Sequence, residues 1–452
     1  MKIVIIGNGV AGTNAARYIR KRSNHRVTMI SEETWQPFSR TALMYVFMGH
    51  VKLSGTYLYE DWFWGKNRID RILDRVVRVD FESKQVLLER TGDTIDYDIL
   101  ILATGSKLLK TGVPGEQLEG VQGLYHLQDL EAMERMRTVL SGTSSRAVVV
   151  GGGLIGVEMA EMLHSCRIPV TYLVREKSFW QAGLPPEEGA MIARHIRAHG
   201  IDLQFETTLV SVVGDEHRRV SAVVPSRGVE IPCRFVGLAV GVAPNVDFLR
   251  GGAIEMNRGI LVDAYLATSQ PDVYAIGDCA ELREPALGRR AIEAVWYTGR
   301  MMGQTVAATV CGQKTAYSPG IWFNSAKFFD LEYQVYGDVP AVLPEHCGSI
   351  FWEHSGGEKS IRIHYDKLSG AVTGFCLIGI RYRQEVCARW INEQASLNMV
   401  LANLSLANFD PEFSARYEQY LAPNTVYKRS FKLILIQKLG FVARFFRGAG
   451  FN

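Results

Sequence analysis

The chain has 452 residues, of which 47% are hydrophobic and 21% are charged. This is the composition of a folded protein and argues against extensive disorder, and the length predicts about three domains at roughly 100–200 residues each. A net charge of +3 does not indicate a nucleic-acid binder. The seven cysteines show no C-x-x-C spacing, which gives no support for a zinc ribbon, an iron–sulfur motif or a disulfide framework.

The first element is an apolar run, Ile3 to Ile6, that leads directly into a glycine motif. The run predicts a buried parallel strand and is too short for a signal peptide. The motif is G-x-G-x-x-G, and a helical pattern over 14–21 and a strand over 26–30 follow it. Its candidate dinucleotide contacts are Gly7, Gly9, Val10, Ala11 and Gly12. Glu32, followed by Glu33, lies 20 residues past Gly12, the spacing of a carboxylate that binds a ribose 2′-hydroxyl.

The same arrangement recurs further along the chain. A strand over 147–150 leads into a second motif, and a helix begins near Val157. The candidate contacts are Gly151, Gly153, Leu154, Ile155 and Gly156. A strand over 170–174 then reaches Arg175 and Glu176. The offset from Gly7 to Gly151 equals that from Glu32 to Glu176, 144 residues, so we interpret the two segments as an internal repeat of two dinucleotide-binding units.

Each unit closes on a strand with a glycine turn. The first turn is Ala103-Thr104-Gly105, and the second ends at Gly241. A later strand ends at Gly277 and Asp278. A carboxylate at the carboxyl end of a strand faces the crevice where α/β sheets bind ligands, so Asp278 is a candidate polyol ligand.

These motifs resemble those of the pyridine-nucleotide-dependent FAD oxidoreductases over residues 1 to about 318. The resemblance implies that the first unit binds FAD, that the second binds NADH or NADPH, and that Asp278 holds the ribityl chain or the pyrophosphate end. The loop Pro37-Phe38-Ser39-Arg40 resembles the branch of apoptosis-inducing factor, ferredoxin reductases and NADH-nitrite reductases, and implies that Arg40 contacts the adenylate side. Many members of that branch have a lysine where this chain has Tyr45.

Further roles follow from the resemblance. Glu158 is the candidate catalytic residue, beside the nicotinamide, and Ala294, Val295 and Trp296 lie at a helix start near the flavin pyrimidine. Val77 is a further candidate cofactor contact. Residues 41–50 contain no cysteine, which argues against a thiol relay. Glu176 favours NADH, whereas Arg175 favours the 2′-phosphate of NADPH, and we lean to NADH.

We therefore expect an α/β fold with two Rossmann-like domains, a C-terminal α+β interface domain and a basic apolar tail. The expected boundaries are 1–112 and 253–318 for the FAD domain, 113–252 for the NAD(P) domain, 319–426 for the interface domain and 427–452 for the tail. Alternating runs from about 333 to 380 predict antiparallel strands, and 383–408 is helical. His346, His354 and His364 are scattered, and no metal site is expected.

The tail contains six Lys or Arg residues and no acid. It could lie on an anionic membrane surface, bind an acidic partner or pack on the chain itself. No run approaches the ~20 apolar residues of a spanning helix. We expect a cytoplasmic protein, peripheral on the membrane if the tail binds it, and a homodimer or a subunit of a complex.

The expected function is an NAD(P)H-dependent FAD oxidoreductase. It would pass electrons to a redox protein or a membrane quinone without a redox-active disulfide. The alternative is an FAD-containing structural or signalling subunit with little turnover of its own.

Overall fold

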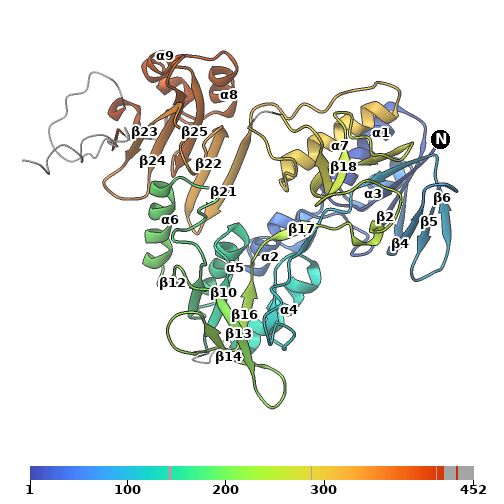
Figure 1. Cartoon of the computed structure of the whole chain (residues 1–452), viewed down its shortest axis with the longest axis horizontal. Coiled ribbons are helices and arrows are strands. Elements are labelled where there is room, and N and C mark those ends of the chain that lie inside the picture. Colours follow the sequence, from blue (N-terminus) through green and yellow to red (C-terminus); the bar gives the residue numbers. More distant parts are fainter. Residues whose placement is uncertain (141–144, 287, 414, 422–433, 436–452) are drawn as a thin grey trace, which may run out of the picture. The chain divides into compact units, whose positions relative to one another are not determined.

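A computed structural model describes residues 1–140, 145–286, 288–413, 415–421 and 434–435. The chain forms two compact units (Figure 1). Unit 1 contains Met1–Lys177 and Gly200–Gly320, and unit 2 contains Ser178–His199 and the chain from Ile321 onward. The segment 178–199, which the sequence assigns to the NAD(P) domain, thus groups with the C-terminal region. The five predicted domain boundaries remain a prediction.

The N-terminal part of unit 1 is built on a five-stranded parallel sheet in the order β19-β7-β1-β2-β3. The central strands β1 and β7 are almost wholly apolar because both faces of a parallel sheet are covered, whereas the edge strand β3 carries Asp70 and Arg71. The bounds are β1 (Lys2–Ile6), β2 (Arg26–Ser31), β3 (Ile69–Leu73), β7 (Ile99–Leu102) and β19 (Val273–Ala275). The predicted strands at 3–6 and 26–30 are present, and β19 returns from far along the chain to complete the sheet.

Helices α1 (Val10–Arg22) and α7 (Trp296–Val310) lie side by side against this sheet (Figure 1). Glycine permits their close approach, since a Cβ on Gly303 would lie 2.5 Å from the Ala11 carbonyl oxygen. The helix predicted after the first glycine motif is therefore present. Its partner α7 begins at Trp296, at the predicted helix start.

The second dinucleotide unit repeats the design in the sheet β12-β11-β10-β16-β9, which is also parallel. Helix α5 (Leu154–Ser165) follows β10 as α1 follows β1. The strands are β9 (Val121–Gln122), β10 (Ala147–Val150), β11 (Val170–Leu173), β12 (Asp202–Gln204) and β16 (Phe235–Leu238). Two parallel sheets of this kind make the fold a mixed α/β fold, as predicted.

Shorter elements complete unit 1. The helices are α2 (Leu43–Phe47), α3 (Asp61–Lys66) and α4 (Leu127–Leu140), and the 3₁₀ turns are η1 (Arg40–Ala42), η2 (Leu53–Thr56), η3 (Asp247–Leu249) and η4 (Gly277–Cys279). Two antiparallel three-stranded sheets contain β4 (Val76–Asp80), β5 (Gln85–Leu88) and β6 (Thr94–Asp96), and β13 (Leu209–Gly214), β14 (Val220–Pro225) and β15 (Ile231–Pro232). The remaining pairs are β8 (Ser106–Leu108) with β17 (Val242–Pro244) and β18 (Ile260–Val262) with β20 (Ala280–Leu282).

Unit 2 is an antiparallel sheet in the order β21-β22-β25-β24-β23-β26. Its strands are β21 (Phe323–Phe328), β22 (Leu331–Gly337), β23 (Cys347–Glu353), β24 (Ser360–Asp366), β25 (Val372–Ile378) and β26 (Ile434–Leu435). The predicted strands between 333 and 380 are present. The helical stretch predicted over 383–408 is divided into α8 (Gln384–Asn392), α9 (Leu397–Ala402) and η5 (Leu404–Ala407), and η6 (Glu418–Tyr420) follows.

The two faces of this sheet have different partners. Ile363 and Phe375 pair across β24 and β25 and belong to the apolar core with α8 and α9. Their neighbours Arg362 and Cys376 point to the opposite face because side chains alternate along a strand. On that face lies α6 (Pro186–Ala198), whose Glu188 binds Arg362. The α6 segment is therefore an integral layer of unit 2.

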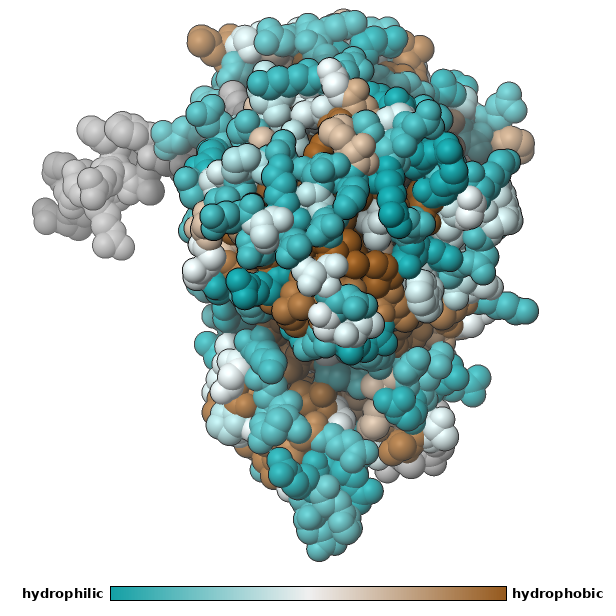
Figure 2. Space-filling view, turned by 90° about the vertical axis from the view of Figure 1, so that its right-hand side faces the viewer, coloured by the Kyte–Doolittle hydropathy of each residue, from teal (hydrophilic) through white to brown (hydrophobic). Residues whose placement is uncertain are grey.

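In the described part of the chain, no helix is long and apolar enough to span a bilayer. Figure 2 shows hydrophilic residues over most of the face in view, with hydrophobic residues in smaller areas among them. Of the predicted tail, only Ile434–Leu435 are described, as strand β26 beside β23. The predicted basic apolar tail over 427–452 otherwise lies outside the described residues.

Candidate active site

Unit 1 contains a cavity of about 520 Å³ at the carboxyl ends of β1, β2 and β7. Such an edge is where α/β sheets bind ligands, because loops of variable sequence meet there above a rigid sheet. The predicted site residues that line the cavity come from both dinucleotide units. They are Gly7, Gly9, Val10, Ala11, Glu32, Glu33, Arg40, Ala103, Thr104, Gly105, Leu154, Ile155, Glu158, Gly277, Asp278, Ala294, Val295 and Trp296.

The first glycine turn has a specific steric role at each position. Gly7 has a φ of 111°, and a Cβ there would lie 2.1 Å from the Ala103 carbonyl oxygen. A Cβ on Gly12 would lie 2.1 Å from the Gly7 oxygen, so Gly12 packs the helix against the turn and does not line the cavity. A Cβ on Gly9 would meet no protein atom within 4 Å. Gly9 therefore keeps the cavity open at the N-terminus of α1, where backbone N–H groups favour phosphate.

The second glycine turn reproduces this geometry. Gly151 has a φ of 118°, and its Cβ would lie 2.2 Å from the Ala239 oxygen. A Cβ on Gly156 would lie 2.2 Å from the Gly151 oxygen, and one on Gly153 would meet nothing within 4 Å. The 144-residue repeat in the sequence is thus a repeat in three dimensions.

Besides Gly151, Gly153 and Gly156, three predicted residues of the second unit lie outside the cavity lining: Arg175, Glu176 and Gly241. Gly241 has a φ of 115° in the turn after β16, and the others follow β11. Arg175 and Glu176 form an ion pair with an Nη2–Oε1 distance of 2.8 Å. A carboxylate and a guanidinium therefore stand together at the position that the sequence predicts to distinguish a ribose hydroxyl from a phosphate, and this role stays a prediction.

Asp278 is buried at the cavity wall. Burial raises the pKa of its carboxyl, while a hydrogen bond from Ser106 and the charge of Arg40 lower it. The Ser106 hydroxyl donates to Oδ2 at 2.7 Å. A desolvated carboxylate with remaining acceptor capacity suits a polyol, whose hydroxyl groups donate hydrogen bonds.

Arg40 and Glu33 form a second polar group at the cavity, with an Nη2–Oε2 distance of 2.7 Å. Burial alone would raise the pKa of Glu33, but hydrogen bonds from His126 and Arg40 hold it at about 2. The Arg40 guanidinium also lies over the Tyr125 ring, 4.6 Å from its centroid. Glu32 instead pairs with Arg75 at 3.4 Å and is half exposed.

Helix α5 brings the second unit to the cavity. Leu154 and Ile155 line it from the first turn of the helix, and Glu158 lines it from the second. Burial raises the pKa of the Glu158 carboxyl to about 8, and the nearby charge of Glu161 adds to this. Glu158 is therefore largely protonated at neutral pH and can donate a hydrogen bond to a group in the cavity.

The N-terminus of α7 closes another side of the cavity with Ala294, Val295 and Trp296. The positive end of the helix dipole faces this region and stabilises negative charge there. Beside it, Glu293 is bound by Arg289 at 2.5 Å and fixes the turn that enters the helix.

Val77 is the remaining predicted contact. It belongs to β4, but the residue of that strand that lines the cavity is its neighbour Val76. Sequence reasoning also missed Thr41, Ser106, Tyr125 and Asn245, which line the cavity. Ser106 directly follows the predicted turn at Gly105, and this adjacency was the available signal. Thr41 likewise directly follows the Pro37-Phe38-Ser39-Arg40 loop, whereas Tyr125 and Asn245 have no recognisable motif beside them.

No cysteine belongs to the described residues that line this cavity. Cys279 follows Asp278 but is fully buried, and its thiol lies 3.4 Å from the Leu102 carbonyl oxygen. Burial raises the pKa of this thiol. Cys279 is therefore a packing residue.

The pyridine nucleotide-disulphide oxidoreductase family matches residues 1–308 of the chain. The chain belongs to this family. The fold agrees with that match. So do the two glycine turns with the helix N-termini that follow them, at residues 7–12 and 151–156, which we call the first and second cradles. The predicted superfamily is confirmed.

Three proteins illustrate the likeness. The chain is 29% identical over 82% of its length to nitrite reductase [NAD(P)H] of Bacillus subtilis, of which it spans 45%. It is 28% identical over 74% of its length to rubredoxin-NAD(+) reductase of Ectopseudomonas oleovorans, of which it spans 86%. The crystal structure of a ferredoxin reductase from Rhodopseudomonas palustris has a TM-score of 0.75 and 25% identity, with 83% of this chain and 91% of that chain covered. The chain thus spans less than half of the nitrite reductase and most of the other two.

The residues present fit the two cofactors of the family, FAD and NAD(P)H. The absence of a side chain at Gly9 leaves space for a pyrophosphate at the N-terminus of α1. The buried Asp278 carboxylate can accept hydrogen bonds from the hydroxyl groups of a polyol chain. The second cradle offers the same geometry at Gly153. The predicted enzyme class, an NAD(P)H-dependent FAD oxidoreductase, is confirmed.

Proposed function

We propose that this chain oxidises NADH and delivers the electrons singly to a small redox protein. The observation that carries the proposal is the shared cavity, because Glu158 of the second cradle and Gly9 of the first line the same space. A nicotinamide held by the second cradle would reach the flavin ring there. Flavin accepts a hydride and can release its electrons one at a time, which couples a two-electron donor to a one-electron acceptor.

Glu158 would orient the nicotinamide. With a pKa of about 8 its carboxyl is mostly neutral near pH 7 and donates a hydrogen bond. A neutral group also avoids placing a fixed negative charge beside a site that becomes negative on reduction. The α7 N-terminus at Trp296 would stabilise that charge.

The acceptor is proposed from two lines of support. The cavity lining in the described part of the chain contains no cysteine, so no thiol relay is available there. Two of the similar proteins are named as reductases of rubredoxin and ferredoxin, which are redox proteins. A quinone is the competing acceptor, and its support is the predicted basic tail at 427–452.

The preference for NADH rests on Glu176. Its carboxylate repels a 2′-phosphate, and it also engages the neighbouring Arg175 in an ion pair. The pairing lowers the capacity of Arg175 to bind a phosphate. Dimer formation and attachment to the cytoplasmic membrane face remain predictions from the sequence.

The proposal is tested by anaerobic stopped-flow absorbance with the FAD-loaded chain. NADH should bleach the flavin band faster than NADPH, and oxidised rubredoxin or ferredoxin should restore it. If a soluble quinone restores the flavin band and neither redox protein does, the acceptor is a quinone. A flavin that neither nicotinamide bleaches would refute hydride transfer and favour a structural or signalling subunit.

A further inference from the structure

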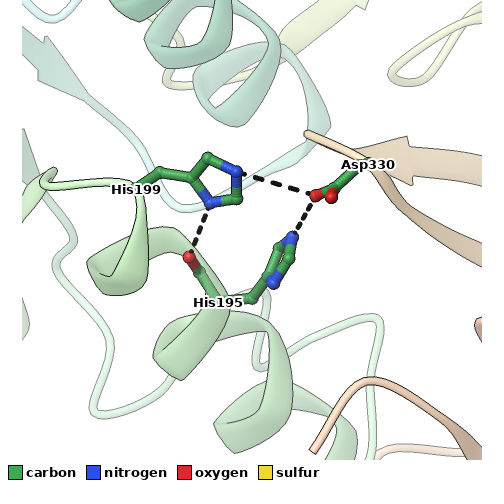
Figure 3. Close-up of side chains that lie close together, drawn as sticks. All are labelled: His195, His199 and Asp330. Atoms are coloured by element: carbon green, nitrogen blue, oxygen red, sulfur yellow. Dashed lines mark hydrogen bonds and ion pairs between the residues drawn. The ribbon is translucent and has the colours of Figure 1, made fainter.

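Unit 2 contains a compact cluster of two histidines and one carboxylate, and none of the three residues belongs to the cavity lining in unit 1. His195 and His199 lie one turn apart at the C-terminal end of α6, and Asp330 lies between β21 and β22. Figure 3 shows the two rings and the carboxylate directed toward one another. One ligand atom from each lies within 4.8 Å of the others.

The distances define the cluster more closely. Asp330 Oδ1 lies 2.6 Å from His195 Nε2 and 3.6 Å from His199 Nε2. The ring centroids of the two histidines are 4.7 Å apart. Both imidazoles thus present the same ring nitrogen to one carboxylate oxygen.

The orientation of His199 is fixed from its other side. Its Nδ1 lies 2.9 Å from the His195 carbonyl oxygen, so Nδ1 carries the proton and donates it there. In the neutral ring this leaves the lone pair on Nε2, which faces Asp330. Metal-binding histidines are held in the same way, by donation of the second ring N–H to a backbone carbonyl.

The opposite side of the cluster is held by a tight turn. Phe329 and Asp330 alone connect β21 to β22, and Phe329 has a φ of 58°. A positive φ at a bulky residue costs about 1 kcal/mol or more and persists where the surroundings impose it. The Phe329 ring stacks on His199 with centroids 4.4 Å apart, which fixes both the turn and the ring.

We propose that His195 Nε2, His199 Nε2 and Asp330 Oδ1 bind one divalent ion of the zinc type. Two imidazoles and a carboxylate suit zinc and its transition-metal neighbours, whereas magnesium and calcium require oxygen ligands. A tetrahedral ion with bonds of about 2.0–2.1 Å needs ligand atoms roughly 3.3 Å apart. Water would occupy the fourth position.

The side chains can reach that geometry because they differ in exposure. His195 is 10% exposed and His199 27%, so the imidazoles are held by packing. Asp330 is 77% exposed, and its carboxylate can shift by the small distance that an ion requires. In the absence of metal, the proton on His195 Nε2 takes the place of the ion between His195 and Asp330.

A bound ion would tie α6 to the β21–β22 turn. His199 is the last residue of the α6 segment before the chain returns to unit 1 at Gly200. The ion would therefore anchor the end of the segment that unit 2 takes from the middle of the chain. This role is separate from the proposed electron transfer and does not depend on it.

The test uses the full FAD-loaded chain after treatment with a chelator. Co²⁺ is titrated as the probe, because its visible absorption reports a tetrahedral site, and Zn²⁺ is then added to displace it. We expect one Co²⁺ per chain at micromolar concentration, with complete displacement by Zn²⁺. Zn²⁺ should also raise the melting temperature, since a ligand that binds only the folded state stabilises it.

The variants His199→Ala and Asp330→Asn should each weaken Co²⁺ binding at least tenfold and abolish the Zn²⁺-induced rise in melting temperature. His217→Ala is the matched control, because His217 is an exposed histidine in unit 1 and should leave the titration unchanged. His199→Ala could fail to fold because His199 is packed. Asp330→Asn changes an exposed side chain and should fold normally, so it keeps the test valid in that case. Equal Co²⁺ affinity in the native chain and Asp330→Asn, or no saturable binding up to about 1 mM, would overturn the proposal and leave an ordinary ion pair.

Discussion

Arg362 and Glu188 are 174 residues apart in the chain and form an ion pair inside unit 2, with an Nε–Oε1 distance of 2.7 Å. Their side chains are 2% and 0% exposed. Arg362 also donates to Glu187 at 2.7 Å and to the Ser349 hydroxyl at 2.9 Å. Burial raises the pKa of Glu188, while the charge of Arg362 lowers it. This contact joins α6 to β24.

Removal of the arginine should destabilise the chain strongly. In Arg362→Ala the Glu188 carboxyl stays buried without its partner, and loss of one member of a buried pair costs about 3–5 kcal/mol. Urea unfolding at pH 7 should show a loss of this size. The double variant Arg362→Met with Glu188→Leu should recover part of it, because neither buried charge remains.

Arg381→Ala is the control for that experiment. Arg381 pairs with Glu332 in the same unit, but its side chain is 56% exposed. A surface pair contributes about 0–1 kcal/mol. Equal losses for Arg381→Ala and Arg362→Ala would contradict the assignment of Arg362 to the interior.

The two glycines of the second cradle should respond differently to alanine. Gly153→Ala adds a Cβ that meets no protein atom within 4 Å, at a φ of −106° that alanine tolerates. We expect an unchanged melting temperature and a KM for NADH raised about tenfold or more, because the methyl group takes space meant for the pyrophosphate. Steady-state kinetics and thermal unfolding measure the two effects.

Gly156→Ala provides the contrast. Its Cβ would lie 2.2 Å from the Gly151 oxygen and 2.5 Å from the Tyr172 hydroxyl, so the protein itself must move. This variant should lose both stability and NADH binding while it retains FAD. A lower melting temperature for Gly153→Ala than for Gly156→Ala would show that the cradle is described wrongly.

The raised pKa of Glu158 should make the stability of the chain depend on pH. The folded pKa of Glu158, about 8, lies above the ordinary value of 4.5 for a glutamate carboxyl, so the folded state binds the proton more tightly. The contribution of this proton to the free energy of unfolding is complete below pH 4.5 and is lost as the pH rises to about 8. The native chain should therefore lose up to roughly 1 kcal/mol per pH unit relative to Glu158→Gln in this window.

The measurement is urea unfolding of both proteins between pH 5 and 9. The difference should level off above about pH 8, where the carboxyl is ionised in both states. Glu161→Gln should reduce the effect, because the charge of Glu161 adds to the raised pKa. A constant difference between native chain and Glu158→Gln over the whole range would exclude the raised pKa.

The sequence predicted the two cradles because their chemistry is local. Glycine spacing, a preceding apolar strand and a following helix are consecutive in the chain, and the structure shows the same steric reason for Gly12 and Gly156. The loops that supply Tyr125 and Asn245 to the cavity have no such pattern, since only the folded sheet edge brings them together.

The grouping of α6 with unit 2 has no signal in the sequence for a similar reason. The position of α6 between the strands β11 and β12 indicates a crossover helix of the second sheet. Its acidic residues Glu187 and Glu188 nevertheless bind Arg362, far along the chain. The H-x-x-x-H spacing of His195 and His199 was visible in the sequence. Asp330, the third member of the cluster, joins them only through the β21–β22 turn.

Glu176 should control the choice between NADH and NADPH. In Glu176→Gln the carboxylate that repels a 2′-phosphate is gone, and Arg175 is released from its 2.8 Å ion pair. We expect kcat/KM for NADPH relative to NADH to rise roughly tenfold or more, because a repulsive group is replaced by an available cation. Arg175→Ala is the matched control and should leave NADH oxidation nearly unchanged while it weakens NADPH use further. An unchanged ratio in Glu176→Gln would mean that this pair does not face the adenosine ribose, and the proposed preference for NADH would lose its basis.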